Sequence, residues 1–307
     1  MSTQLSFVTL DVFTPTRYRG NPLAIIKVPS IVALTQDQKQ EIAREFNLSE
    51  SVFLHEQTAK DRADHSVRID IFTSYAEVPF AGHPTVGTAN YILRQLKNDS
   101  LDDIQALQTK AGRLPWTINP SVGGVQISVA HNLHIHGSPF ADQPFGHFPV
   151  VSIVKGMTFI LVHLPDLDVL AAQTQNLVGR DNTSTATAKL DHGWREGIVV
   201  TYFYVNLGVT DGGINYLRVR SLGSREDPAT GSAASALTSY VSLQTGKAGR
   251  YRYKLTQGVE MGQKSEIFVE IGVKESSTGQ IQEIDDILLS GCGVQTMQGT
   301  LEIPISE

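Results

Sequence analysis

The segment His83-Pro84-Thr85-Val86-Gly87-Thr88-Ala89 has a near copy later in the chain, Asp227-Pro228-Ala229-Thr230-Gly231-Ser232-Ala233. The two segments begin 144 residues apart, and each combines a titratable residue, a proline, a glycine, a hydroxyl and an alanine. Proline suits the first turn of a helix, so both segments are predicted to begin helices. The unpaired N–H groups and the dipole of a helix N-terminus favour an anion. The repeat therefore predicts a duplicated fold whose halves hold an anionic small molecule between them.

Each half of the chain is predicted to surround one of these helices with strands. The helices, about 84–96 and 228–243, are apolar and almost uncharged, so they must be enclosed. Alternating or β-branched stretches around them indicate strands. The pattern predicts an α+β fold of two pseudo-symmetric lobes, each a β-barrel-like sheet wrapped around a central helix. The expected lobes are residues 1–118 plus about 291–307, and residues 119–290, with Asn119-Pro120-Ser121 as a linker.

Further elements are predicted from local signals. Thr35 and Gln38 form a capping-box pattern that begins a helix ending near Asn47. Another helix is expected over 166–175, and the polar segment 179–192 is expected to be a mobile surface loop. The predicted strands are 5–13, 23–28, 51–55, 66–73, 109–118, 125–130, 158–164, 198–207, 215–221, 251–257, 266–273, 286–290 and 299–303.

Composition limits the classes of partner. The 307 residues allow two modest cores. The chain has 25 Lys and Arg against 31 Asp and Glu and no dense basic run, so neither nucleic acid nor a membrane is an expected partner. Cys292, the single cysteine, cannot form an internal disulfide, and no secretory or membrane-spanning pattern is present. We expect a soluble, cytoplasmic protein with a small-molecule partner.

Three titratable residues are candidates for chemistry. Glu50 lies in Asn47-Leu48-Ser49-Glu50-Ser51-Val52-Phe53, where a helix passes into a strand, and a carboxylate that loses hydration there is a usable acid or base. The alternative is a solvent-facing glutamate on a half-buried strand. His83 and Asp227 are expected at or near the helix N-caps. Asp227 is a good cap in its own right, whereas histidine is a poor cap, which favours a role for His83 in proton transfer.

The glycines and hydroxyls of the repeated segments are the expected substrate-binding residues. The hydroxyls of Thr88 and Ser232 can bind a ligand or bond back to their own helix. Gly87 and Gly231 allow a close approach either of a ligand or of a packed strand. The expected set comprises Ser232, Gly82, Thr85, Gly87, Thr230 and Gly231.

A metal or cofactor is not expected. His134 and His136 share one face if their segment is a strand, but no third ligand of metal type is evident. The chain has no phosphate loop, no dinucleotide-binding glycine pattern after a strand and no nucleophile elbow. Cys292 alone cannot supply both bases of a two-cysteine racemase.

The motifs resemble those of the PhzF-like phenazine-biosynthesis family. The matching segments are Asp11-Val12-Phe13, Gly20-Asn21-Pro22, Asn47-Leu48-Ser49-Glu50, Glu77-Val78-Pro79-Phe80-Ala81-Gly82-His83-Pro84-Thr85, Glu226-Asp227-Pro228-Ala229-Thr230-Gly231-Ser232-Ala233 and Gln257-Gly258-Val259-Glu260-Met261-Gly262. The resemblance implies the diaminopimelate epimerase-like fold, a site in the cleft between lobes, a homodimer and isomerisation without metal or cofactor. It places the catalytic glutamate on Glu50 and polar site residues on His83, Asp227 and Ser232.

The chain departs from the family pattern in two places. It has Gly262-Gln263-Lys264-Ser265 where the family often has Gly-Arg-Pro-Ser, and it lacks the usual Phe and Pro in Arg220-Ser221-Leu222-Gly223-Ser224-Arg225. The substrate is therefore left open. The leading interpretation is a cofactor-independent isomerase that uses Glu50 as acid and base. The alternatives are a racemase or epimerase of a small acid, and a binding protein that has lost turnover.

Overall fold

The structure, a computed structural model, describes residues 4–96, 104–142, 146–275 and 282–305. Its contacts divide the chain into two compact units, residues 1–128 with 290–307 (unit 1) and residues 129–289 (unit 2). The lobe boundaries expected after residues 118 and 290 stay a prediction. No helix among the described residues is long and apolar enough to cross a membrane.

Unit 1 is a sheet with one enclosed helix and two helices outside it. Its elements are β1 (Gln4–Val12), β2 (Asn21–Val28), α1 (Gln36–Phe46), β3 (Ser51–His55), α2 (Ala59–Ala63), β4 (Ser66–Phe72), β5 (Glu77–Val78), α3 (Gly82–Leu96), β6 (Ala106–Thr109), β7 (Gly112–Asn119), η1 (Pro120–Val122), β8 (Gly124–Ser128) and β20 (Gly293–Glu302).

Unit 2 is built on the same plan. Its elements are β9 (His134–Ile135), β10 (Phe140–Asp142), β11 (Gly146–Phe148), β12 (Val150–Val154), β13 (Met157–His163), α4 (Leu167–Ala171), η2 (Arg180–Asn182), η3 (Thr185–Lys189), β14 (Ile198–Val209), β15 (Ile214–Leu222), β16 (Glu226–Asp227), α5 (Gly231–Gln244), β17 (Gly249–Gln257), β18 (Ser265–Glu275) and β19 (Gln282–Gly291), whose last residues belong to unit 1.

The two units repeat one order of strand pairing. In unit 1, β1–β2, β3–β4 and β6–β7 are antiparallel, and β2–β3 and β4–β6 are parallel. In unit 2, β12–β13, β14–β15 and β17–β18 are antiparallel, and β13–β14 and β15–β17 are parallel. The short strands β5 and β16 pair with β4 and β15 in the same sense. This correspondence confirms the expected pseudo-symmetry of the lobes.

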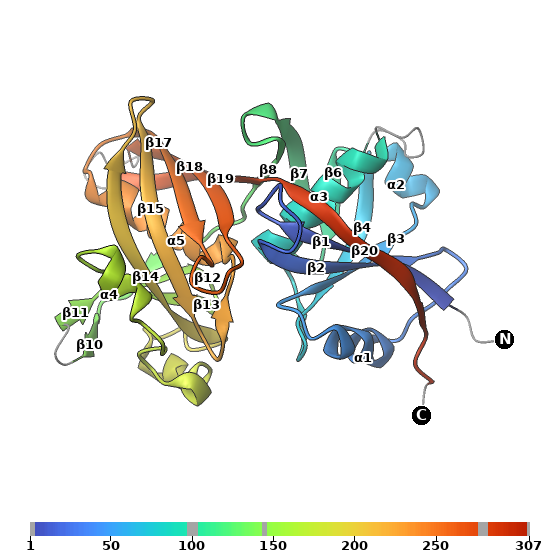
Figure 1. The fold of residues 1–307 in the computed structure, drawn as a ribbon, viewed down its shortest axis with the longest axis horizontal. Coiled ribbons are helices and arrows are strands. Elements are labelled where there is room, and N and C mark those ends of the chain that lie inside the picture. The colour runs from blue at the N-terminus through green and yellow to red at the C-terminus, as the bar shows by residue number, and fades with distance from the viewer. Residues whose placement is uncertain (1–3, 97–103, 143–145, 276–281, 306–307) are drawn as a thin grey trace. The chain divides into compact units, whose positions relative to one another are not determined.

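Each sheet encloses its helix, as expected from the apolar composition (Figure 1). α3 contacts β1, β2, β3, β8 and β20, and α5 contacts β12, β13, β17 and β18. Every residue of α5 from Gly231 to Ser239 is buried. Because most of these side chains are small, strands can approach the helix on several sides. Among them, the hydroxyls of Ser235 and Thr238 donate to carbonyls one turn earlier, at 2.9 and 2.8 Å, which satisfies them inside the core.

The capping signal of α1 is confirmed. The Thr35 hydroxyl accepts from Gln38 N at 3.2 Å, and the Gln38 side chain accepts from Thr35 N at 3.0 Å. The helix ends where Asn47 takes the left-handed conformation, with φ of 48°. The passage from α1 into β3 that carries Glu50 is therefore determined by local sequence.

Several other local predictions were wrong. The strand expected over 109–118 is the antiparallel pair β6 and β7, and Asn119-Pro120-Ser121 lies at the turn between β7 and β8 rather than in a linker. α4 ends at Ala171, well before the expected end of its helix. The segment 179–192, expected to be a surface loop, contains two short 3₁₀ helices and the buried Leu190, which packs in the core of unit 2.

Candidate functional site

The loop-to-helix junctions of the two units correspond at a spacing of 149 residues rather than 144. α3 and α5 begin at Gly82 and Gly231, and the strands β5 and β16 before them begin at the same separation. The first helical hydrogen bonds are donated by Thr85 to Ala81 and by Ala234 to Thr230, again 149 residues apart. Each junction is a two-residue strand, a proline, two residues and the glycine that starts the helix.

This register changes the pairing of the candidate residues. His83, the second residue of α3, corresponds to Ser232, the second residue of α5. Asp227 corresponds to Val78 and lies in β16, so its expected position at or near a helix N-cap was wrong. The repeat of similar letters misled because the onset of each helix follows the end of the short paired strand, and the two phrases lie five residues out of register with those strands.

In unit 1 the structure brings Glu50 and His83 together, although they are 33 residues apart. Nδ1 of His83 lies 2.8 Å from Oε2 of Glu50. The side chain of His83 is 3% exposed and that of Glu50 is 20% exposed. The histidine is therefore a fixed, buried partner, whereas the carboxylate keeps one side open.

The second nitrogen of His83 determines how many protons the pair holds. Nε2 lies 3.2 Å from the backbone oxygen of Asn21. A carbonyl oxygen only accepts, so Nε2 carries a proton. The contact between Nδ1 and Glu50 then needs one more proton, held either on a neutral glutamic acid or on an imidazolium. One proton shared between an imidazole and a half-open carboxyl group is the arrangement that an acid–base catalyst needs.

The other residues expected to bind substrate in unit 1 lie around the start of α3. Gly82 is its first residue and is buried. The Thr85 hydroxyl donates to the carbonyls of Ala81 and Gly82, both at 2.9 Å. Gly87 lies against the strands, because a Cβ there would be 2.5 Å from Leu23 Cδ2. These contacts favour structural roles for Thr85 and Gly87, and their substrate-binding roles stay predictions.

In unit 2, Asp227 is held by the loop before α5. The Thr230 hydroxyl donates to Oδ2 of Asp227 at 2.6 Å, so Thr230 binds another side chain rather than capping its own helix. Gly231 and Ser232 then begin the helix. Among the described residues the Ser232 hydroxyl has no hydrogen-bonding partner, although the residue is only 7% exposed. It is therefore available to a ligand.

Gln257 organises this loop, and its side chain is fully buried at the end of β17. Its Nε2 donates to the Asp227 carbonyl at 2.7 Å and to the Thr230 hydroxyl at 3.1 Å. Its Oε1 accepts from the Tyr202 hydroxyl at 3.0 Å and from Thr230 N at 3.3 Å. Burial, and then the charge of Asp227, raise the pKa of Tyr202, so its hydroxyl stays a donor. The sequence analysis quoted Gln257 only within a family motif and missed this role.

An ion pair fixes the strand that carries Asp227. Nε and Nη2 of Arg220 donate to the two carboxylate oxygens of Glu226 at 2.8 and 2.7 Å. Nη1 of Arg220 donates to the last carbonyls of α4, on Leu170 and Ala171. The hydrogen bonds with Glu226 raise the pKa of Arg220 despite its burial. β16 is thereby tied both to β15 and to α4.

Comparisons with known proteins agree with the fold and the motifs. The family model described as phenazine biosynthesis-like protein (PhzC-PhzF) matches residues 10–299. An uncharacterized isomerase of Mesorhizobium japonicum is 30% identical over 88% of this chain and 91% of its own length. The trans-2,3-dihydro-3-hydroxyanthranilate isomerase of Pseudomonas fluorescens is 27% identical, with 96% of this chain and 99% of that protein aligned.

A solved structure shares the architecture. The PhzF-family phenazine biosynthesis protein of Bacillus anthracis superposes with a TM-score of 0.71 at 19% identity, over 98% of this chain and 100% of that one. The fold expected from the sequence, that of diaminopimelate epimerase-like proteins, is confirmed. With the family model matched over nearly its whole length, the chain belongs to the phenazine biosynthesis-like PhzC-PhzF family of isomerases.

Proposed function

We propose that the protein is a cofactor-independent isomerase that moves a proton on a small carboxylated or carbonyl-containing metabolite, with Glu50 as general acid and base. The observation that carries the proposal is the 2.8 Å contact between Glu50 and His83, in which only the carboxyl group is partly open. A surface glutamate without a role has no need of a buried partner that fixes one of its oxygens.

The proposed step begins with Glu50 as carboxylate and its partner His83 as imidazolium. Oε1 or Oε2 of Glu50 takes a proton from a carbon that an adjacent carbonyl, imine or carboxyl group acidifies, which leaves a delocalised anion. The same oxygen returns that proton to another carbon of the system on the same face. The step is balanced within the substrate, and His83 stabilises the charge on Glu50 before and after it.

Residues of unit 2 are proposed to bind the substrate's polar groups. Asp227 is positioned by Thr230 and Gln257, and Ser232 offers a hydroxyl beside the first N–H groups of α5. Such N–H groups stabilise a carboxylate or a developing enolate. That the substrate lies between the lobes, that the protein is a homodimer and that it works in the cytoplasm follow from the family resemblance and the composition, and are part of the proposal.

The Pseudomonas relative is named for an unsaturated cyclic amino acid, a small carboxylate with hydrogens made acidic by conjugation. The same chemical class is proposed here. Lys264 and the segment 221–225 depart from the family motifs, so the substituents on that framework are expected to differ.

The proposal is tested by screening small carboxylates in deuterated water with the wild-type protein and two variants. Glu50→Gln keeps the size of the side chain but cannot carry the proton, so exchange and turnover should be lost while thermal unfolding is unchanged. Glu45→Gln, on the exposed side of α1, is the matched control and should retain activity. Turnover in Glu50→Gln at the wild-type rate would overturn the assignment.

The same screen separates the alternatives. An isomerase changes the position of the double bond in its product, and a shared carboxyl group returns part of the original proton. A racemase exchanges a single Cα hydrogen with solvent and leaves the bonding unchanged. A metabolite that binds tightly and shows neither exchange nor conversion would indicate a binding protein.

A further inference from the structure

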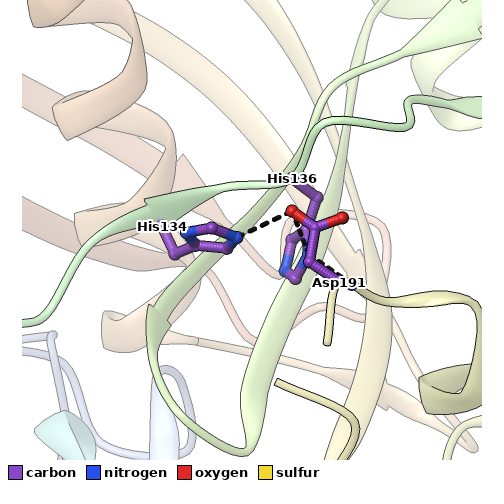
Figure 2. Close-up of side chains that lie close together, drawn as sticks. All are labelled: His134, His136 and Asp191. Atoms are coloured by element: carbon purple, nitrogen blue, oxygen red, sulfur yellow. Dashed lines mark hydrogen bonds and ion pairs between the residues drawn. The ribbon is translucent and has the colours of Figure 1, made fainter. Parts of the chain in front are cut away.

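Three side chains of unit 2, outside the residues discussed so far, converge beside β9. His134 and His136 come from β9 and its end, and Asp191 follows η3 (Figure 2). Nε2 of His134 lies 2.9 Å from Oδ2 of Asp191, and Nδ1 of His136 lies 3.7 Å from the same oxygen. The three ligand atoms all lie within 4.8 Å of one another. The sequence analysis saw no third ligand because Asp191 is 55 residues from His136 along the chain.

The donor set is of the kind that binds divalent transition metals. Two imidazole nitrogens and one carboxylate are ligands of Zn²⁺ and its neighbours, with bonds of about 2.0–2.2 Å. Tetrahedral bonds of that length place the ligand atoms roughly 3.3 Å apart. The separations to Oδ2 of Asp191, 2.9 and 3.7 Å, lie on either side of this value. An ion therefore needs only small movements of the three side chains.

The side chains are held in the required orientation by their other contacts. Nε2 of His136 bonds to the Ser152 hydroxyl at 2.9 Å, which directs Nδ1 toward Asp191. Ser152 is in turn bonded to Thr158 at 2.6 Å, and all three of these residues are buried. The backbone N–H of Gly137 donates to Oδ2 of Asp191 at 3.0 Å. Hydrogen bonds of this kind fix the tautomer and direction of metal ligands.

The site has an apolar wall and an open side. The indole of Trp194 stacks on the ring of His134, with centroids 4.5 Å apart and planes 7° from parallel. The side chains of His134 and Asp191 are 30% and 34% exposed, whereas that of His136 is 1% exposed. An ion entering from solvent would reach His134 and Asp191 first and would keep room for a water ligand.

We propose that His134, His136 and Asp191 bind a divalent transition ion of the Zn²⁺ class through His134 Nε2, His136 Nδ1 and the Asp191 carboxylate, with water as fourth ligand. The ion replaces the proton between His134 and Asp191 and the long 3.2 Å bond from Asp191 N to His136 Nδ1. Its role is to fasten the chain after η3 to β9. The proposal does not depend on the isomerase activity.

Calorimetric titration of chelator-treated protein with ZnCl₂ tests the site. We expect one ion per chain with a dissociation constant in the micromolar range or below, and a higher melting temperature when Zn²⁺ is present. His134→Ala and Asp191→Asn should each weaken binding by at least about tenfold. His147→Ala, an exposed histidine of the same unit, is the matched control and should bind as the wild type does.

Tryptophan fluorescence gives a second readout that needs no ligand variant. The chain has two tryptophans, so Trp116→Phe leaves Trp194 as the sole reporter. Co²⁺ or Cu²⁺ bound at Nε2 of His134 should quench the stacked indole, and excess Zn²⁺ should restore it by competition. Absence of saturable Zn²⁺ binding overturns the proposal, as does binding that is unchanged in folded His134→Ala and Asp191→Asn.

Discussion

His83 directs Nδ1 to Oε2 of Glu50 at 2.8 Å while its other nitrogen is fixed by the carbonyl of Asn21 at 3.2 Å. The imidazole therefore cannot change its tautomer without losing one of these bonds. It holds Glu50 in one orientation and balances its charge, although only the glutamate is partly open. Removing His83 should reduce the chemical step more than it weakens substrate binding.

We expect His83→Leu to lower kcat by roughly 10²–10⁴-fold with a much smaller change in KM, once a substrate is known. The control is His65→Gln, because His65 is exposed. Steady-state kinetics and circular dichroism of both variants provide the check. A His83→Leu enzyme with kcat within a few-fold of wild type would mean that Glu50 works without this partner.

The buried amide of Gln257 should be needed for the stability of unit 2 as well as for the position of Asp227. Gln257→Met keeps the volume but leaves the Tyr202 hydroxyl and Thr230 N without their acceptor. At about 1–3 kcal/mol for each buried group left unsatisfied, the free energy of unfolding should fall by roughly 2–4 kcal/mol. Urea denaturation measures this loss. Gln244→Met, at the exposed end of α5, should be close to neutral.

The sequence predicted those elements whose signals are local. The capping box at Thr35 located α1, and the uncharged composition of α3 and α5 showed that a sheet encloses each of them. The length of α4 and the order within 179–192 depend on packing against the rest of unit 2, as the buried Leu190 shows. No local pattern carries that information.

The candidate site divides in the same way. Glu50 and His83 were identified by residue type and context, but their contact depends on where α3 lies relative to the β2–β3 pair. Asp227 was placed at a helix start because two phrases share letters, whereas strand pairing shifts the true register by five residues. Gln257 and Asp191 act through partners that only the folded sheet brings near, so sequence spacing could not reveal them.

A buried charge cluster should make unit 1 sensitive to acid. Asp70 bonds to Lys39 Nζ at 2.6 Å and to His55 Nε2 at 2.8 Å. Burial alone would raise the pKa of Asp70, but the hydrogen bonds of His55 and Lys39 outweigh it and hold the pKa well below its usual value. The folded form thus binds the proton less readily than the unfolded chain. Its stabilisation is complete above about pH 4 and is lost as pH falls toward the folded-state pKa.

The corresponding variant is Asp70→Asn, which leaves Lys39 buried without its carboxylate. We expect a loss of about 3–5 kcal/mol of unfolding free energy at pH 7, and a smaller difference from wild type as pH is lowered below about 4. Denaturant unfolding at several pH values measures both. Asp211→Asn, in an exposed turn, is the control. A difference that stays constant down to pH 2 would show that the charge of Asp70 is not what stabilises the fold.

Gly87 is expected to be required by packing, whatever its relation to a substrate. A Cβ at this position would lie 2.5 Å from Leu23 Cδ2 and 2.7 Å from Val12 Cγ2, and both neighbours are fully buried. Gly87→Ala should therefore destabilise by about 1–3 kcal/mol, although alanine gains up to about 1 kcal/mol in helix propensity. Combining it with Leu23→Ala provides the control, because the shorter side chain makes room for the methyl group. If the clash is the cause, the double variant should lose less stability than the sum of the single variants, and thermal or urea unfolding of all three measures that coupling. Additive losses would place the requirement for glycine in the backbone instead.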